Sequence, residues 1–264
     1  MGSTIKILIN GDKCIGCGQC VADCPSHILE IKNRKANLSS DQCLKCGHCF
    51  AICPANAVNL DGVEDDILEK NEMTKMLDED NLKAHLKLRR SIRQYKQTSV
   101  EREKLEKIIE AGRLTPSGSN SQNVRYIVVQ KDVEDLEDNV LTQYKKLRKW
   151  AILFGRFLKI PDISKYKFER GFLFKKAPAL ILVISESNVN ASLAAMSMEL
   201  MAESLGLGSL YVGLFTRPAN RNKSLRKSLG IAKKEKIVIC LAVGYPTVTY
   251  RRSAPKKSAN TIWL

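Results

Sequence analysis

The stretch CIGCGQCVADCP occupies residues 14–25, and CLKCGHCFAICP repeats its pattern at residues 43–54. Both read C-x2-C-x2-C-x3-C-P, and every cysteine of the first stretch recurs 29 residues later in the second. This repetition predicts two similar half-domains. Eight of the nine cysteines lie in these stretches, whereas Cys240 sits in the apolar run KIVICLAVGY and is interpreted as a small core residue.

The spacing of the eight cysteines predicts two four-iron, four-sulfur clusters. Three thiolates separated by two residues can surround one cubane while the intervening amides point at its sulfides, and the cysteine before the proline ligates the other cluster. Small residues at Gly16, Gly18 and Gly47 suit such tight loops. A pair of four-cysteine zinc sites is the alternative, because zinc sites also use C-x2-C pairs. The predicted ligand sets are Cys14, Cys17, Cys20 and Cys53, and Cys43, Cys46, Cys49 and Cys24.

Residues 1–62 are therefore predicted to form a small ferredoxin-like domain with two clusters. Short strands at residues 28–31 and 36–38 bracket the turn-like NRK and predict a hairpin. Each half has little apolar core, so the clusters would tie distant segments together. Residues 63–82 are rich in acids and are interpreted as a linker with a helix.

Residues 83–264 have the longer elements of an α/β domain, expected as a mixed sheet flanked by helices. Apolar periodicity and turn signals predict each element. Helices are expected at residues 100–114, 133–158 and 191–205, the last capped by Gly206, and from Pro218 to about residue 229. Strands are expected at residues 126–130, 179–184, 211–214 and 237–243.

Charge is distributed unevenly along the chain. The formal net charge is +15, yet residues 1–82 contain 8 Lys and Arg against 13 Asp and Glu, while residues 83–264 contain 35 against 15. A helix with Lys83, Lys87, Arg89 and Arg90 could lie on nucleic acid. A basic face could equally steer an acidic electron donor, and we favour that interpretation over a nucleic-acid partner. Without a secretory start or a long apolar run, the expected location is the cytoplasm, with no membrane partner.

Two polar segments of the larger domain are candidates for ligand binding. RRSIR, at residues 89–93, places three guanidinium groups and a hydroxyl within five residues, a set that can grip a phosphate, although a solvated helix end is the simpler alternative. PSGSNSQ, at residues 116–122, offers amide and hydroxyl donors, as many surface turns do. The glycines of GLGSLYVG, at residues 206–213, lack the spacing of a dinucleotide fingerprint.

In their order along the chain, these segments resemble the nitroreductase family of FMN enzymes, in its ferredoxin-fused branch. The matching segments are RRSIRQY (89–95), PSGSNSQ (116–122), ASLAAMSMELMAESLGLGSLYVG (191–213), and VGYP (243–246) followed by Arg251 and Arg252. The resemblance implies an α+β homodimer with FMN bound at the subunit interface.

The resemblance also implies roles for individual residues. Arg89, Arg90, Ser91 and Arg93 match the segment that holds the phosphate and ribityl chain, and Pro116, Ser117 and Asn120 match a loop that reaches the flavin from the partner subunit. Tyr211, Val212 and Gly213 match the stretch beside the isoalloxazine ring, and Arg251 and Arg252 match the carboxyl-terminal phosphate contacts. Strand core is the alternative for Tyr211 and Val212, and a solvated charge for Arg251. No side chain is assigned a catalytic role.

Clusters carry one electron at a time, whereas a flavin accepts single electrons and delivers a pair. The expected function is thus an iron-sulfur flavoprotein oxidoreductase that reduces a small acceptor, such as a nitroaromatic, a quinone or an activated alkene. Reduced ferredoxin or NAD(P)H is the expected donor. The alternative is an electron-transfer subunit that docks onto another redox enzyme and has no small-molecule substrate of its own.

Overall fold

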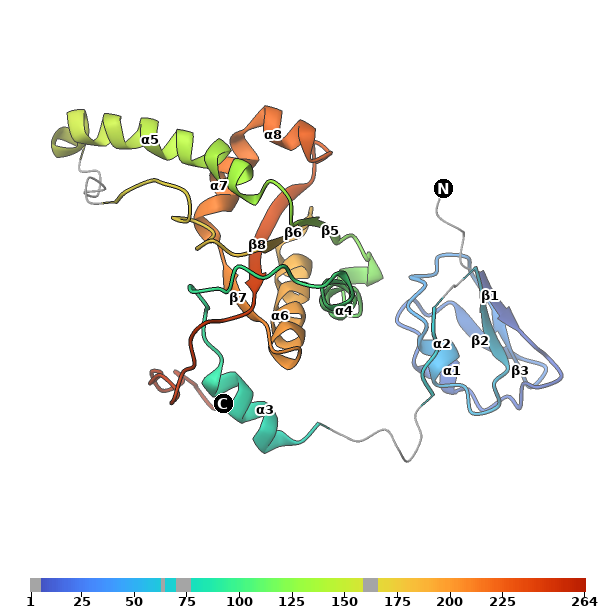
Figure 1. Ribbon diagram of the computed structural model, residues 1–264. Coiled ribbons are helices and arrows are strands. Elements are labelled where there is room, and N and C mark those ends of the chain that lie inside the picture. Colours follow the sequence, from blue (N-terminus) through green and yellow to red (C-terminus); the bar gives the residue numbers. More distant parts are fainter. Residues whose placement is uncertain (1–5, 63–64, 70–76, 159–165) are drawn as a thin grey trace. The chain divides into compact units, whose positions relative to one another are not determined.

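The computed structural model describes residues 6–62, 65–69, 77–158 and 166–264. These residues fall into two compact units, one drawn from residues 1–76 and 118–121 and the other from residues 77–117 and 122–264 (Figure 1). Within the described residues, no helix combines the length and the apolar character that crossing a membrane requires.

The amino-terminal unit is built from two halves that repeat one another in structure. In chain order its elements are β1 (Lys6–Ile9), α1 (Gln19–Ala22), β2 (Leu29–Lys32), β3 (Lys35–Leu38), α2 (His48–Ala51) and β4 (Val58–Asp61). Each element of the first half recurs 29 residues later, which confirms the predicted half-domains. The predicted hairpin is confirmed as β2–β3, while β1 and β4 were not predicted.

The two halves exchange strands rather than folding side by side. β1 pairs antiparallel with β4, and β2 pairs antiparallel with β3, so each two-stranded sheet takes one strand from each half. The registers are equivalent under the 29-residue shift, since Lys6 lies opposite Asp61 and Lys35 lies opposite Lys32. The two halves are therefore related by an internal pseudo-twofold symmetry.

The tight loops before α1 and α2 depend on left-handed backbone. Gly18 and Gly47 precede the two helices with φ of 77° and 75°. Gly16 has φ +71°, and a Cβ added to it would lie 2.2 Å from the carbonyl oxygen of Arg34. Lys45 occupies the equivalent position in the second half with φ 54°. Thus the left-handed conformation tolerates a side chain there, whereas the space beside Gly16 does not.

The carboxyl-terminal unit is a four-stranded sheet between two layers of helices. Its strands are β5 (Arg125–Val129), β6 (Ala179–Ser185), β7 (Gly208–Tyr211) and β8 (Lys236–Gly244), in the order β5-β6-β8-β7. Its helices are α3 (Glu79–Leu88), α4 (Arg102–Arg113), α5 (Val133–Leu158), α6 (Asn188–Ser204), α7 (Gly213–Arg221) and α8 (Lys223–Ser228).

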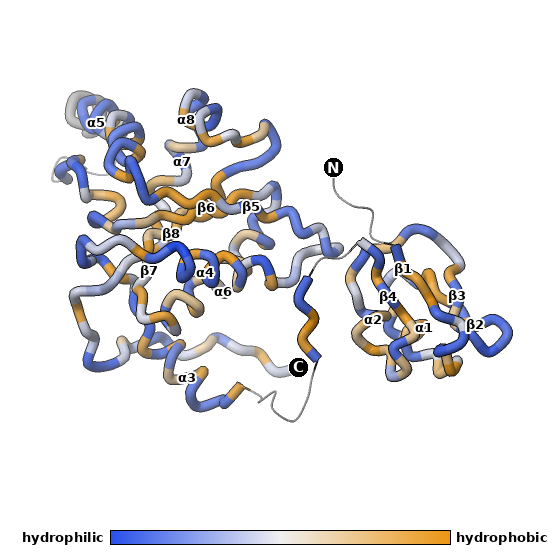
Figure 2. Tube along the Cα trace, turned by 45° about the vertical axis from the view of Figure 1, so that its right-hand side comes forward, coloured by the Kyte–Doolittle hydropathy of each residue, from blue (hydrophilic) through white to orange (hydrophobic). Residues whose placement is uncertain are grey.

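The α+β class is confirmed, but the expected mixed sheet is corrected: all three pairings among these described strands are antiparallel. Apolar runs such as β6, buried along its whole length, resemble strands of parallel sheets. In this antiparallel sheet, β6 is buried because helices cover both of its faces. Leu180, Leu182 and Ile184 share a core with α5, α7 and α8, and the alternate residues share one with α4 and α6. Figures 1 and 2 show these layers around apolar strands.

The predicted elements agree with the structure within a few residues, except around residues 211–221. The expected strand at residues 211–214 instead ends at Tyr211, and Pro218 lies inside α7 rather than at its start. Proline removes the helical hydrogen bond to the Leu214 carbonyl. The Tyr144 hydroxyl donates to that carbonyl at 2.6 Å, so α7 continues through the proline without an unpaired acceptor.

The second unit begins just before α3. The Asp78 side chain caps this helix by accepting a hydrogen bond from the Asn81 backbone N–H at 2.7 Å. α3 therefore runs across the boundary expected at residues 82 and 83. Residues 63–64 and 70–76 of the expected linker lie outside the described residues.

Candidate functional site

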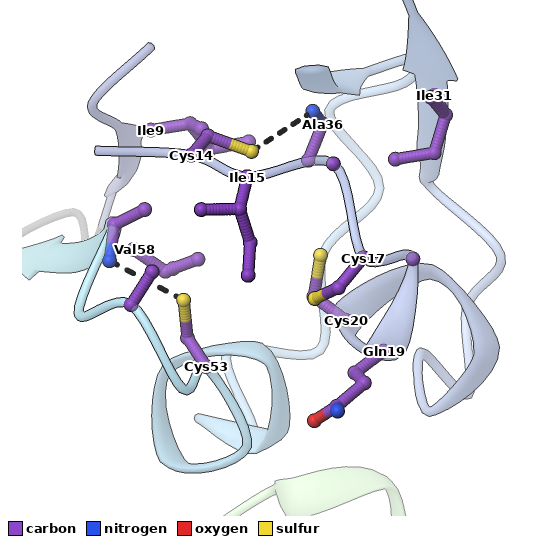
Figure 3. A pocket seen from close by; sticks show the side chains of 14 residues that line it. Ile9, Cys14, Ile15, Cys17, Gln19, Cys20, Ile31, Ala36, Cys53 and Val58 are labelled. Carbon is purple, nitrogen blue, oxygen red and sulfur yellow. Dashed lines mark hydrogen bonds between the residues drawn. The ribbon is translucent and has the colours of Figure 1, made fainter. Parts of the chain in front are cut away.

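Four cysteines surround a hollow in the amino-terminal unit (Figure 3). Cys14, Cys17 and Cys20 come from the first repeat, and Cys53 arrives from the second. The hollow has a largely apolar wall that includes Ile9. The structure thus brings together the four residues of one predicted ligand set.

The second ligand set surrounds a second hollow. Its wall contains Cys43, Cys46 and Cys49 of the second repeat together with Cys24 of the first. Each cage therefore takes three cysteines from one half and one cysteine from the other half. Within the described residues, no three His, Cys, Asp or Glu side chains lie close enough to hold a single metal ion. Each hollow is instead lined by four cysteines, the number of thiolates that a 4Fe-4S cubane takes.

Backbone amides point at several of these sulfurs. Cys14 Sγ accepts from the Ala36 N–H at 3.4 Å, and Cys43 Sγ accepts from the Lys45 N–H at 3.2 Å. Hydrogen bonds from the Ala36 and Gly16 amides hold the pKa of the Cys14 thiol below its ordinary value. Such donors favour the thiolate, which is the form that ligates iron.

Burial has the opposite effect on other cysteines. It raises the pKa of the Cys20 and Cys49 thiols. Cys240 is 1% exposed in the core of the larger unit, where burial raises its thiol pKa, and it takes no part in either cage. Its predicted role as a small core residue fits this position.

In the carboxyl-terminal unit, the RRSIR segment runs along the edge strand β7. The Ile92 N–H donates to the Ser209 carbonyl at 2.9 Å, and the Tyr95 hydroxyl donates to the Ile92 carbonyl at 2.9 Å. Gly208 permits this approach, because a Cβ there would lie 2.2 Å from Ile92 Cγ1. The segment with the predicted phosphate contacts is thereby attached to the strand that ends at Tyr211.

One N–H group of the Arg90 side chain is buried and has no acceptor among the described residues. Arg90 Nη1 donates to the Arg89 carbonyl at 2.5 Å, while Arg90 Nη2 is buried and has no hydrogen-bond partner among the described residues. Because an unpaired buried cationic donor is costly, this geometry fits an anionic ligand. Ser91 is half-buried, and Arg93 is exposed with Nη1 3.3 Å from the Ser91 carbonyl.

Glu199 of α6, which the sequence analysis missed, lies beneath this segment. Its side chain is 3% exposed, and its Oε1 accepts from Arg89 Nη1 at 2.8 Å and from Ser209 Oγ at 3.4 Å. The available signal in the sequence was its spacing. Glu199 lies four residues after Ala195 and three before Ala202, on the buried face of an apolar helix.

The stretch predicted beside the flavin ring joins β7 to α7. The Tyr211 hydroxyl donates to the Ala195 carbonyl at 3.0 Å, and burial together with the nearby Glu199 charge raises the pKa of this phenol. Val212 is buried, and its N–H donates to the Cys240 carbonyl at 2.8 Å. Gly213 is exposed and begins α7 without a side-chain cap.

The remaining predicted residues lie in irregular segments. Pro116 and Ser117 follow α4, and Ser117 Oγ accepts from the Gln122 N–H at 2.9 Å. Asn120 ends a short 3-10 turn, Gly118–Asn120, with φ 49°. Arg251 and Arg252 are exposed in the segment after β8. The roles assigned to these five residues stay predictions.

Residues 86–245 match the model of the nitroreductase family, more than half of the chain. The chain belongs to the nitroreductase family. Residues 6–71 match a 4Fe-4S dicluster domain. Together with the two cages, this match identifies the cofactors of the amino-terminal unit as two 4Fe-4S clusters rather than zinc ions. This nitroreductase family member is therefore an oxidoreductase with a ferredoxin-like iron-sulfur domain.

Individual relatives agree with both assignments. A putative NADH dehydrogenase/NAD(P)H nitroreductase of Archaeoglobus fulgidus is 31% identical over 168 residues, which cover 60% of this chain and 81% of the relative. Ferredoxin-2 of Desulfomicrobium norvegicum is 48% identical over 31 residues, 12% of this chain and 52% of the ferredoxin. A nitroreductase from Desulfitobacterium hafniense, solved with bound FMN, has a TM-score of 0.56 and 23% identity over 71% of this chain and all of its own, and shows the fold.

Proposed function

We propose that this chain is an iron-sulfur flavoprotein that gains electrons singly at its cluster domain and reduces a small acceptor at an FMN site. The observation that carries the proposal is the presence of two complete four-cysteine cages in one chain with a nitroreductase domain. When bound, 4Fe-4S clusters transfer single electrons, and FMN exchanges electrons singly or as a pair. The acceptor is a nitroaromatic, a quinone or an activated alkene.

The RRSIR segment is proposed to hold the FMN phosphate. Arg90 offers the buried, unpaired Nη2, and Arg93 adds a second cation, which is exposed. This combination suits a phosphate dianion. The start of α7 at Gly213 lacks a side-chain cap, so the N–H groups of Gly213 and Leu214 are proposed as donors for a polar ring edge. The nitroreductase structure from Desulfitobacterium hafniense contains FMN, which supports this choice of cofactor.

A homodimer is proposed because α6 has a second apolar face. Its inner face is buried against the sheet, yet Val189, Leu193 and Met196 on the outer face are 67%, 45% and 37% exposed. An apolar stripe of this kind on a central helix favours a protein partner. In the dimer, Pro116, Ser117 and Asn120 would approach the flavin of the partner subunit.

Anaerobic purification followed by iron, sulfide and flavin analysis tests the cofactors. We expect about eight iron atoms and about one FMN per chain. Colourless protein without flavin after attempted reconstitution contradicts the proposal.

Stopped-flow mixing tests the route of the electrons. Reduced ferredoxin should bleach the flavin absorbance of the wild type quickly, and that of the double variant Cys17→Ser, Cys46→Ser slowly. Mixing both proteins with NAD(P)H measures direct reduction as a comparison. Equal rates for wild type and variant with ferredoxin would exclude the clusters as the entry route. If no small acceptor is turned over, the chain is instead an electron-transfer subunit.

A further inference from the structure

We infer that Glu199 is a positioning residue that sets the preference of the flavin site for a phosphorylated flavin. It does so by holding Arg89, whose backbone in turn holds the Arg90 guanidinium. The inference rests on the proposed function, because it assumes that the RRSIR segment binds the phosphate of FMN.

Glu199 is a buried acid with a defined set of partners. Its side chain is 3% exposed, and burying a carboxylate is costly unless it is paired with an opposite charge. Arg89 supplies that charge at 2.8 Å, and the Ser209 hydroxyl donates a weaker bond at 3.4 Å. Since the Ser209 carbonyl also accepts the Ile92 N–H, Glu199 is linked both to β7 and to the segment lying on it.

Arg89 transmits this constraint to Arg90. α3 ends at Leu88, and Arg89 is its carboxyl-terminal cap, with φ −50° and ψ 134°, where the chain changes from helix to extended backbone. An ion pair at this turning point fixes the direction of the Arg89 carbonyl. That carbonyl accepts Arg90 Nη1 at 2.5 Å, which leaves the buried Nη2 as the group presented to a ligand.

Arg89 and Arg90 therefore have different roles. The charge of Arg89 is matched by Glu199, whereas Arg90 Nη2 has no partner within the described residues. A phosphate dianion would therefore gain its buried contact from Arg90. A flavin without phosphate would gain nothing from this chain of contacts.

Flavin binding to the full-length protein, freed of flavin, tests the inference with FMN and riboflavin as the two probes. We expect Glu199→Gln to weaken FMN binding by about tenfold or more, and riboflavin binding by less than about twofold. The matched control is Glu203→Gln, one turn along α6, where Glu203 Oε1 lies 3.7 Å from His85 Nδ1. This variant should bind both flavins as the wild type does.

A double-mutant cycle in FMN affinity gives a second measurement that does not depend on one variant alone. Because Glu199 acts through Arg89, the variant Arg89→Gln, Glu199→Gln should bind FMN no more weakly than Arg89→Gln. Unlike Arg89→Gln, this double variant contains no unpaired buried carboxylate, so we expect it to fold more readily. Additive losses would overturn the inference.

The outcomes separate this inference from the proposed function. If the wild type does not bind FMN, both fail. If the wild type prefers FMN over riboflavin but Glu199→Gln binds FMN equally well or more tightly, or loses both flavins equally, only the role of Glu199 is refuted.

Discussion

Replacing Gly16 with alanine is expected to remove one cluster and to leave the other in place. An added Cβ would lie 2.2 Å from the Arg34 carbonyl oxygen, whereas real Cβ contacts are at least 3.0 Å. The backbone at residue 16 and that of Arg34 must then separate by about 0.8 Å, and the second of these precedes Ala36, whose N–H donates to Cys14 Sγ. Ligand sites tolerate displacements of roughly 0.5 Å, so this shift is large enough to break the cage.

Gly18→Ala is the matched control for this change. Gly18 has φ +77°, and a Cβ there would meet nothing within 4 Å. Both variants therefore carry the cost of a left-handed alanine, about 1–2 kcal/mol. Only Gly16→Ala adds an overpacking cost of roughly 1–3 kcal/mol. Lys45, with φ 54° at the equivalent place in the second half, shows that the conformation alone is tolerated.

Iron analysis and electron paramagnetic resonance of the reduced, oxygen-protected protein provide the assay. The wild type and Gly18→Ala should contain about eight iron atoms per chain, and Gly16→Ala about four. The remaining signal should come from the cage of Cys24, Cys43, Cys46 and Cys49. A Gly16→Ala protein with the full iron content and the unfolding midpoint of Gly18→Ala would refute the steric argument.

Three further predictions concern the larger unit. Glu137 is 2% exposed and accepts the backbone N–H of Gly171 at 2.6 Å, among three such bonds, so Glu137→Gln should cost about 1.5–3 kcal/mol in the free energy of unfolding measured with denaturant. The Arg125 guanidinium holds the pKa of Glu235 below its ordinary value. Their pair thus stabilises the fold above pH of about 4.3 and ceases to do so as pH falls through the lowered pKa. Glu235→Gln should therefore be less stable than the wild type by up to about 1 kcal/mol at neutral pH and equally stable in acid, as urea unfolding at each pH will show. Finally, Leu193→Glu should convert the proposed dimer into monomers in size-exclusion chromatography with light scattering, because it places a charge in the exposed stripe of α6.

Each of these predictions has a control and an opposing result. Glu134→Gln removes only an exposed contact with Arg170, and its cost should stay below about 1 kcal/mol. A loss as small for Glu137→Gln would exclude an anchoring role for that acid. A stability difference for Glu235→Gln that stays constant with pH would show that its ionisation is irrelevant. A dimeric Leu193→Glu protein would place the interface elsewhere.

The cluster domain could be predicted in more detail than the rest because its chemistry fixes the spacing of the ligands. Cysteines that must surround a cubane have few possible separations, and their repetition reveals the two halves. The strands β1 and β4 were missed because each has only four residues and pairs with a distant segment of the chain. Short strands of this kind carry little signal in their own sequence.

The proposed flavin site could be predicted only in part from its own sequence. RRSIR identifies cations, but the choice between a phosphate site and a solvated helix end depends on burial. The unpaired Nη2 of Arg90 and the pairing of Glu199 with Arg89 become visible only in the folded structure. The error at Pro218 has a similar origin, because the hydroxyl that satisfies the Leu214 carbonyl comes from Tyr144, 70 residues away in sequence.

The crossed pairing of the two halves also bears on how this domain could have arisen. Because β1–β4 and β2–β3 obey the same register under the 29-residue shift, one half alone presents a strand edge and an orphan cysteine that a second copy of itself would complement. We expect a synthetic peptide of one half to assemble with iron and sulfide as a symmetric pair, never as a lone chain. Duplication and fusion of such a peptide would turn that association into a single polypeptide.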